Sequence, residues 1–234
     1  MTTRSLHAAR ACFLVLAMVA AAPAQSPRFE PVLENRQVSV FSIDLPPGRR
    51  AAVFQNTHDI FWIALSPGRV TMSDRDGNKT PVTFRPGDTR FFPSVRTSSI
   101  TNDAAEPFHA LLVQIKPRGL ASSCGCDGDA ERAVCGCPRA APLPAMWAVG
   151  IGSVVIGGTV LAPRQSFDSA GERGDTLLVA LSSLTLADDA RDTSPNAARA
   201  TINLRPGEAR WLPAGVHKLR NTGATPARYV TLEF

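Results

Sequence analysis

Few side chains in this sequence could do acid–base or metal chemistry, and they are widely spaced. Beyond the N-terminal segment, the histidines are His58, His109 and His217. An imidazole can transfer a proton near neutral pH or ligate a metal ion, but a divalent metal is held tightly only by three or four side-chain ligands. We therefore expect His217 to be a hydrogen-bonded structural residue, with a role as metal ligand as the alternative. We expect neither His58 nor His109 to bind metal.

The densest group of reactive side chains is a pair of Cys-Gly-Cys units separated by eight residues: Cys124, Cys126, Cys135 and Cys137. In an oxidising compartment, four such cysteines usually form two disulfides. A bridge within one unit would require strained geometry, so we expect cross-pairs, most simply Cys124 with Cys137 and Cys126 with Cys135. The alternatives are a four-thiolate zinc or copper(I) site, and disulfide exchange, which the neighbouring acidic residues disfavour.

The N-terminus predicts an exported protein. Residues 1–24 contain Arg4 and Arg10, then an apolar run of about 12 residues, then Ala-Pro-Ala, which is the order found in secretory signal peptides. A run of this length is too short to cross a bilayer, which needs about 20 apolar residues. We therefore expect a periplasmic or extracellular mature protein without a membrane segment.

The charge of the chain argues against nucleic acid as a partner. Loss of Arg4 and Arg10 would lower the formal net charge from +5 to +3. The remaining basic residues form neither a run nor an aromatic platform of the kind that binds phosphates. The remaining length, roughly 210 residues, is enough for two small domains that each have their own core.

Two blocks of sequence recur in the same order. Residues 85–93 (RPGDTRFFP) recur as residues 205–213 (RPGEARWLP), and residues 59–66 (DIFWIALS) recur as residues 175–182 (DTLLVALS). Such a repeat indicates a repeated supersecondary unit. We therefore predict two copies of one domain, residues 30–116 and 147–234, joined by a cysteine-rich insertion and linker at residues 117–146.

Each copy consists of short apolar stretches divided by turn residues. The Asp76-Gly77-Asn78 segment predicts a hairpin, and both Pro-Gly pairs of the repeat predict tight turns. No stretch after the N-terminal segment keeps helical spacing of apolar residues for three turns. The fold class that follows is all-β, with two antiparallel jelly-roll barrels. The strands expected in the first copy are residues 38–45, 51–55, 60–65, 70–73, 81–84, 89–92, 97–101 and 108–115.

The second copy resembles the second sequence motif of the cupin superfamily. That motif reads Gly, five residues, Pro, one residue, Gly, two residues, His, three residues, Asn. Gly207, Pro213, Gly215, His217 and Asn221 fall at these places, with one residue instead of two before the histidine. The first copy keeps only Gly87, Pro93 and Asn102. The resemblance implies two tandem cupin barrels, in other words a bicupin.

The first cupin motif, which normally supplies a His-x-His pair and a Glu as metal ligands, is degenerate. The corresponding residues are 54–58 (FQNTH) in the first copy and 170–173 (AGER) in the second. Neither contains His-x-His. We therefore expect no cofactor, with a divalent metal at His217 as the alternative.

Arg90 and Arg210 recur at equal places in the two copies and are candidate ligand-binding residues, since each could point an anion-binding guanidinium into a barrel. The alternative, which strand alternation favours, is that both side chains face outward into solvent. Asp59 and Asp175 recur likewise, and we expect them at turns or strand starts rather than as catalytic bases.

These observations favour a non-catalytic, degenerate bicupin that binds a small molecule or an envelope protein, as a monomer or a homodimer. One alternative is a cupin-type metalloenzyme, such as a dioxygenase or isomerase, with an unorthodox site around His217. The other is metal or thiol handling by the Cys-Gly-Cys units. The sequence leaves the ligand open.

Overall fold

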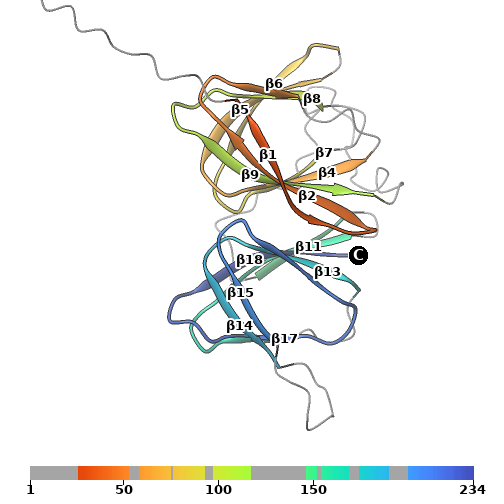
Figure 1. Ribbon diagram of the computed structural model, residues 1–234, viewed down its shortest axis with the longest axis vertical. Helices are drawn as coiled ribbons and strands as arrows, with labels where there is room; N and C mark the ends of the chain where they lie inside the picture. Colours follow the sequence, from red (N-terminus) through yellow and green to blue (C-terminus); the bar gives the residue numbers. More distant parts are fainter. Residues whose placement is uncertain are drawn as a thin grey trace, which may run out of the picture.

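The structure, a computed structural model, describes residues 26–52, 58–74, 76–92, 97–116, 146–151, 154–168, 174–189 and 200–234. All regular secondary structure within these residues is β-strand, joined by turns and bends (Figure 1). The described residues contain no helix of the length and apolarity needed to span a bilayer. The expected signal peptide, the four cysteines and residues 117–145 of the predicted insertion and linker lie outside the described residues, whereas Met146 already belongs to a strand.

The first barrel consists of two antiparallel sheets. One has the strand order β1-β2-β9-β4-β7 and the other has the order β3-β8-β5-β6. The strands are β1 (Arg28–Glu34), β2 (Val38–Leu45), β3 (Arg50–Ala52), β4 (Asp59–Ala64), β5 (Gly68–Asp74), β6 (Lys79–Phe84), β7 (Thr89–Phe92), β8 (Thr97–Asn102) and β9 (Phe108–Ile115).

The second barrel repeats this topology strand for strand. Its sheets have the orders β10-β11-β18-β13-β16 and β12-β17-β14-β15, which is the first pattern with β10 in place of β1 and β18 in place of β9. The predicted fold class, two tandem jelly rolls, is therefore confirmed. The strands are β10 (Met146–Ile151), β11 (Val154–Leu161), β12 (Ser166–Asp168), β13 (Thr176–Ala180), β14 (Leu184–Asp188), β15 (Ala200–Leu204), β16 (Ala209–Leu212), β17 (Lys218–Asn221) and β18 (Ala227–Glu233).

The structure contains three apolar cores. One lies inside each barrel, and the third lies between the barrels and joins them. In β4, Ile60 and Trp62 point into the first barrel, whereas Phe61 and Ile63 point toward the second barrel. The five-stranded sheets of the two barrels face each other across this middle core, as the stacking in Figure 1 shows. Because both faces of these sheets are covered, β4 is buried at every position.

The two Pro-Gly turns of the repeat are built in the same way. Gly87 and Gly207 have φ angles of 91° and 84°, values at which a residue with a Cβ atom would be strained. The carboxylates of Asp88 and Glu208 accept the backbone N–H groups of residues 85 and 205, at 2.8 and 2.7 Å respectively. The acidic residue after each glycine is therefore explained by turn formation.

The strand predictions for the first barrel were accurate for β2, β7 and β9, whose bounds agree residue for residue. The prediction missed β1, because Pro31 interrupts its pattern and the pairing with β2 shifts register between Pro31 and Leu33. The predicted hairpin at residues 76–78 joins β5 to β6, where Gly77 has a φ of 85°.

Candidate functional site

His217 is held on both sides of its ring. Its Nδ1 lies 2.6 Å from Asp188 Oδ2, and its Nε2 lies 2.8 Å from the carbonyl oxygen of Pro213. The two side chains of the ion pair are only 13% and 9% exposed. A doubly protonated imidazolium can donate to both oxygens, whereas a neutral ring can donate to only one of them. The geometry therefore fits a charged histidine paired with a carboxylate.

Asp188 is a residue that the sequence did not single out. It ends β14, and its second oxygen accepts the backbone N–H of Lys218 at 3.1 Å. Leu186, two residues earlier on the same face, lines the interior of the second barrel. Asp188 thus links β14 to the start of β17 at one end of this interior. Because 29 residues separate it from His217, only the strand pairing could reveal this contact.

Asn102 and Asn221, the last residues of the two cupin-like motifs, have the same structural role in each barrel. Both are buried, at 0% and 1% exposure. Asn221 Nδ2 donates to the carbonyl oxygens of Leu161 and Thr225, and its Oδ1 accepts the N–H of Gly223. Asn102 makes the three equivalent bonds. Both asparagines therefore fix a turn rather than bind a ligand.

Arg90 lies on the inner face of the first barrel. It is paired directly with Trp62 across β4 and β7, and Trp62 is part of the barrel interior. The nitrogens Arg90 Nε and Trp62 Nε1 are both buried and have no hydrogen-bond partner within the described residues. The expectation of an outward, solvated Arg90 is wrong, because the other face of this sheet is occupied by the second barrel.

Arg210 occupies the equivalent position in the second barrel but differs in its surroundings. It is paired with Leu178, which belongs to the core of the second barrel, so its side chain also projects from the inner face of its sheet. The residue as a whole is exposed, and none of its nitrogens is buried without a partner in the described structure. The two arginines thus share a backbone position, and only Arg90 lies opposite an indole.

The remaining histidines are apart from these groups. His109 is exposed on β9 with its Nδ1 3.6 Å from Asp44 Oδ1, and the side chains are 49% and 40% exposed. His58 directly precedes β4, and its buried Nδ1 has no hydrogen-bond partner among the described residues. The structure therefore does not bring His58, His109 and His217 together.

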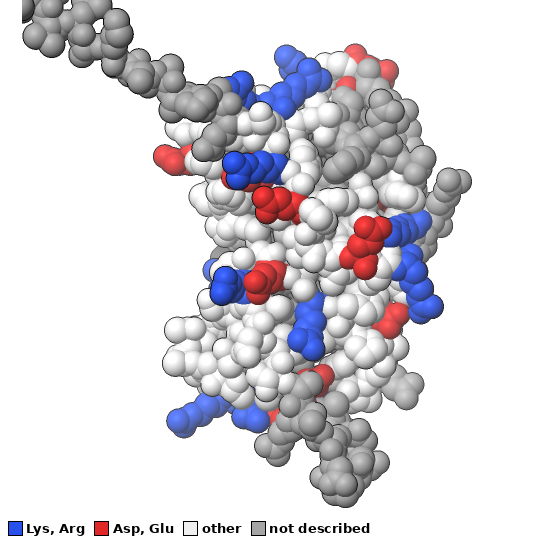
Figure 2. Space-filling model, viewed as in Figure 1, with Lys and Arg blue, Asp and Glu red and all other residues white. Residues whose placement is uncertain are grey.

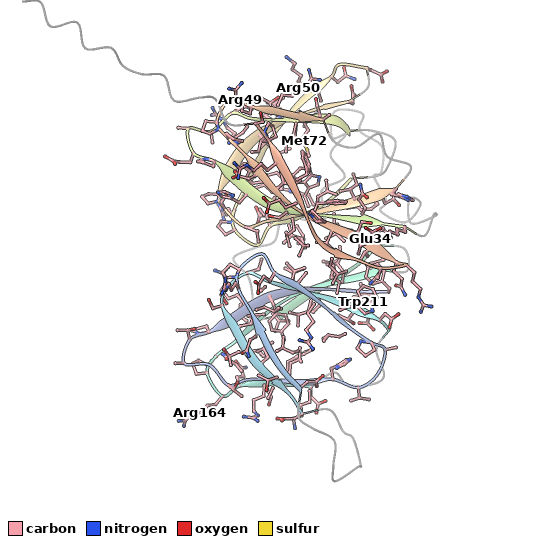
Figure 3. The ribbon with its side chains drawn as sticks, in the orientation of Figure 1. Glu34, Arg49, Arg50, Met72, Arg164 and Trp211 are labelled. Atoms are coloured by element: carbon pink, nitrogen blue, oxygen red, sulfur yellow. The ribbon has the colours of Figure 1, made fainter. Side chains whose placement is uncertain are left out.

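Asp175 stands just before β13 and contributes to the contact between the barrels. Its carboxylate accepts Gln37 Nε2 from the first barrel and the backbone N–H of Ala214, both at 2.9 Å. It also lines an open groove of about 550 Å³ beside the contact between the two barrels. The other residues of this groove are Leu33, Glu34, Asn35, Arg36 and Trp211. Figure 3 shows Glu34 and Trp211 approaching from the two barrels.

The electrostatic perturbations that stand out lie at the surface. The Lys116 ammonium donates to Glu34 at 2.9 Å and lowers the pKa of that carboxyl. A hydrogen bond from Asn78 lowers the pKa of Asp74, and the Asp189 carboxylate raises the pKa of Arg220. Basic and acidic side chains are interspersed on the face shown in Figure 2.

The described residues do not provide a metal-ligand set. Within them, no three His, Cys, Asp or Glu side chains are grouped so that they could hold an ion. His217 would have to give up a hydrogen bond to ligate a metal through either nitrogen. The segments where the first cupin motif would fall are residues 54–58 and 170–173. Of these, only His58 lies within the described residues, and it is the one histidine that the two segments contain.

Comparison with known proteins identifies the fold. No family model and no curated protein matches the sequence. A variant of Bacillus subtilis oxalate decarboxylase superposes with a TM-score of 0.59 at 13% identity, covering 88% of this chain and 72% of that chain. Oxalate decarboxylase from Lactobacillus farciminis gives a TM-score of 0.59 at 12% identity, covering 85% and 77%.

A third solved structure, in which the Mn(II) centres of the Bacillus subtilis enzyme were studied, gives a TM-score of 0.56 at 13% identity and covers 85% of this chain and 69% of that chain. At such identities the similarity establishes a common fold and not a common activity. The expected cupin architecture is therefore confirmed at the level of the fold. This chain has the bicupin fold, two tandem cupin-type jelly-roll barrels packed sheet against sheet.

Proposed function

We propose that this protein is an exported, non-catalytic bicupin that binds a small molecule or an envelope partner. The observation that best supports the proposal is the hydrogen bonding of His217, the only histidine in the sequence of the second repeat. Its two ring nitrogens face Asp188 Oδ2 and the Pro213 carbonyl oxygen, so both nitrogens are already engaged within the protein. A metal-dependent cupin reaction would need this ring as a free ligand.

The apolar interior of the barrels supports the same proposal. Leu178, Leu186 and Tyr229 lie in the interior cluster of the second barrel, and Trp62, Phe84 and Phe108 lie in that of the first. Catalysis by a barrel of this kind would require several convergent polar groups. A binding protein needs only a few polar groups set in an apolar lining.

The alternative is a cupin-type metalloenzyme, and the fold shared with oxalate decarboxylases is its support. That similarity supports a common architecture but not common site residues, because identity is 12–13% across the neighbours described. The Mn(II) centres of the Bacillus subtilis enzyme would need a counterpart ligand set here. The first-motif segments, FQNTH and AGER, do not offer the His-x-His pair.

Metal analysis of the purified mature protein tests the proposal. We expect far less than one Mn, Fe, Ni or Cu ion per chain after incubation with each metal and gel filtration. A matched variant with all four cysteines replaced by serine separates any thiolate-bound ion from a barrel-bound ion. One stoichiometric ion that persists in this variant and is lost in His217→Ala would overturn the non-catalytic proposal.

A further inference from the structure

We infer that the interior of the first barrel binds a small carboxylate through two N–H donors, Arg90 Nε and Trp62 Nε1. The inference rests on the proposed ligand-binding function and names the chemical class of the ligand. Its starting point is that both nitrogens are buried and have no hydrogen-bond partner within the described part of the chain.

The two donors share one face of one pair of strands. Trp62 of β4 and Arg90 of β7 are directly opposite each other in the antiparallel ladder. Opposed residues of such a ladder have Cβ atoms about 5 Å apart and project to the same side. The neighbouring pair, Phe61 and Phe91, projects to the other side, where its ring centroids are 5.0 Å apart in the core between the barrels.

Burial makes these unpaired donors unusual. Trp62 is 0% exposed and belongs to the apolar core cluster of the first barrel. Both N–H groups can only donate, since neither an indole nor a guanidinium carries an acceptor. Native proteins normally pair buried donors, because an unpaired one has lost its hydrogen bond to water without replacement. A ligand with acceptor oxygens would restore those bonds.

The donor set selects a carboxylate. A guanidinium presents Nε–H and Nη–H as a fork that matches the two oxygens of a carboxylate, and the opposed indole adds a further donor. A cation or a hydrocarbon would leave the donors unpaired. Ile60, Met72 and Phe84 belong to the same core cluster, so apolar surroundings favour the carbon body of a monocarboxylate over a phosphate, which stays polar on every side.

The second barrel offers a comparison within the same chain. Arg210 holds the position equivalent to Arg90, but Leu178 stands where the indole would be and the arginine is exposed. A leucine cannot donate a hydrogen bond. We therefore expect one carboxylate per chain, in the first barrel.

Nuclear magnetic resonance of the ¹⁵N-labelled full chain provides the test, with the Trp62 indole N–H signal assigned by its loss in Trp62→Phe. Titration with propionate or benzoate should move this signal downfield and reach saturation, because the N–H gains an acceptor. Arg90→Met should weaken the binding about 10- to 100-fold, the usual effect of losing a charge-assisted bond. Arg90→Lys should be intermediate.

Three controls decide between outcomes. Arg210→Met should leave the titration unchanged, whereas propionamide and inorganic phosphate should not reproduce the shift. Arg90→Met should unfold at the same temperature as the wild type or a higher one when no ligand is present, because it removes an unpaired buried donor.

The inference is overturned if no carboxylate moves the Trp62 signal, or if Arg90→Met binds as tightly as the wild type. A shift of equal size with propionamide or phosphate would also overturn it. If Arg90→Met lowers the unfolding temperature, Arg90→Lys, followed by the same Trp62 signal, still tests the binding directly. Binding of only neutral molecules in the barrel would refute the carboxylate site while leaving the proposed function in place.

Discussion

At the scale of single residues, the polar side chains of the recurring segments fall into two groups. Asn102, Asn221, Asp88 and Glu208 satisfy backbone groups at turns. Arg90 and Trp62 instead contain buried nitrogens that no described protein group satisfies. The first group explains why a cupin-like sequence pattern persists, and the second group is where binding is expected.

The His217–Asp188 pair should contribute more to stability than the similar pair on the surface. Removing one partner of a buried ion pair leaves an uncompensated charge, so His217→Ala should lower the free energy of unfolding by about 2–4 kcal/mol. His109→Ala is the control, because His109 and Asp44 are 3.6 Å apart and half exposed, and it should change stability by less than about 1 kcal/mol. Urea denaturation measures both. Equal effects would contradict the structural role of His217.

The buried asparagines should be needed in both barrels. Asn221→Ala removes three hydrogen bonds and leaves two carbonyl oxygens and one N–H group without that partner. Unpaired buried groups cost about 1–3 kcal/mol each, and partial access of water reduces the total, so we expect a loss of roughly 2–4 kcal/mol. Asn102→Ala should lower the free energy of unfolding by a similar amount. A loss below 1 kcal/mol, or about the effect of an ordinary surface substitution, would argue against this role.

If the protein is exported, as we propose, its four cysteines outside the N-terminal segment should be oxidised. Intact mass after alkylation under native, non-reducing conditions should show no modified thiol, and four modifications should appear after reduction. The reason is that exported chains with paired cysteines encounter an oxidising compartment. Four modifications without reduction would contradict the predicted disulfides and favour a thiolate site.

At the scale of strands and turns, local hydrogen bonds decide where each hairpin closes. The β5–β6 turn is organised by Asp74, whose Oδ1 accepts the N–H groups of Asp76 and Asn78 and whose Oδ2 accepts Asn78 Nδ2. Its pKa is lowered, first by the bond from the Asn78 side chain. The ionised form of Asp74 is therefore the form that stabilises the turn.

This turn should respond to acid in a defined direction. A carboxyl whose folded-state pKa is depressed contributes stability above its unfolded value of about 3.9, and this contribution is lost as the pH falls through the folded value. Asn78→Ala should raise the Asp74 pKa toward the ordinary value, as followed by carboxyl chemical shifts. The pKa of Glu34, which Lys116 lowers at a distant site, should be the same in both proteins. An unchanged Asp74 pKa would contradict the assignment.

At the scale of the whole molecule, the two barrels share an apolar core. The middle core contains buried residues from both repeats, among them Phe61, Phe91, Leu177, Val179 and Leu232. Gly207 supports this contact from the second barrel, because a Cβ atom there would lie 2.9 Å from Leu65 Cδ1 of the first barrel. The repeat thereby covers within one chain an apolar face that a single barrel would expose.

A substitution in the first barrel should consequently loosen the second. Phe61→Ala should lower the free energy of unfolding by about 3–5 kcal/mol, as expected for a buried phenylalanine. Hydrogen exchange should rise in β13 and β18 as well as in β4. Thr83→Ala, at an exposed position of β6, is the control and should alter neither barrel. Faster exchange confined to the first barrel would show that the barrels fold independently.

The sequence by itself determined the repeat, the all-β class and most strands of the first barrel. Period-2 patterning and Pro-Gly or Asp-Gly turns are local properties, and local properties can be seen in sequence. This is why β2, β7 and β9 were predicted with correct bounds, whereas β1, interrupted by Pro31, was not.

Only the tertiary structure decided which face of each strand meets which neighbour. Alternation assigns Arg90 and Phe91 to opposite faces but does not reveal that one face is a barrel interior and the other a second barrel. The same limit hid the contact of His217 with Asp188 and the pairing of Trp62 with Arg90. These contacts join residues about 30 positions apart in the chain, and they depend on strand register, which is fixed only when the sheets assemble.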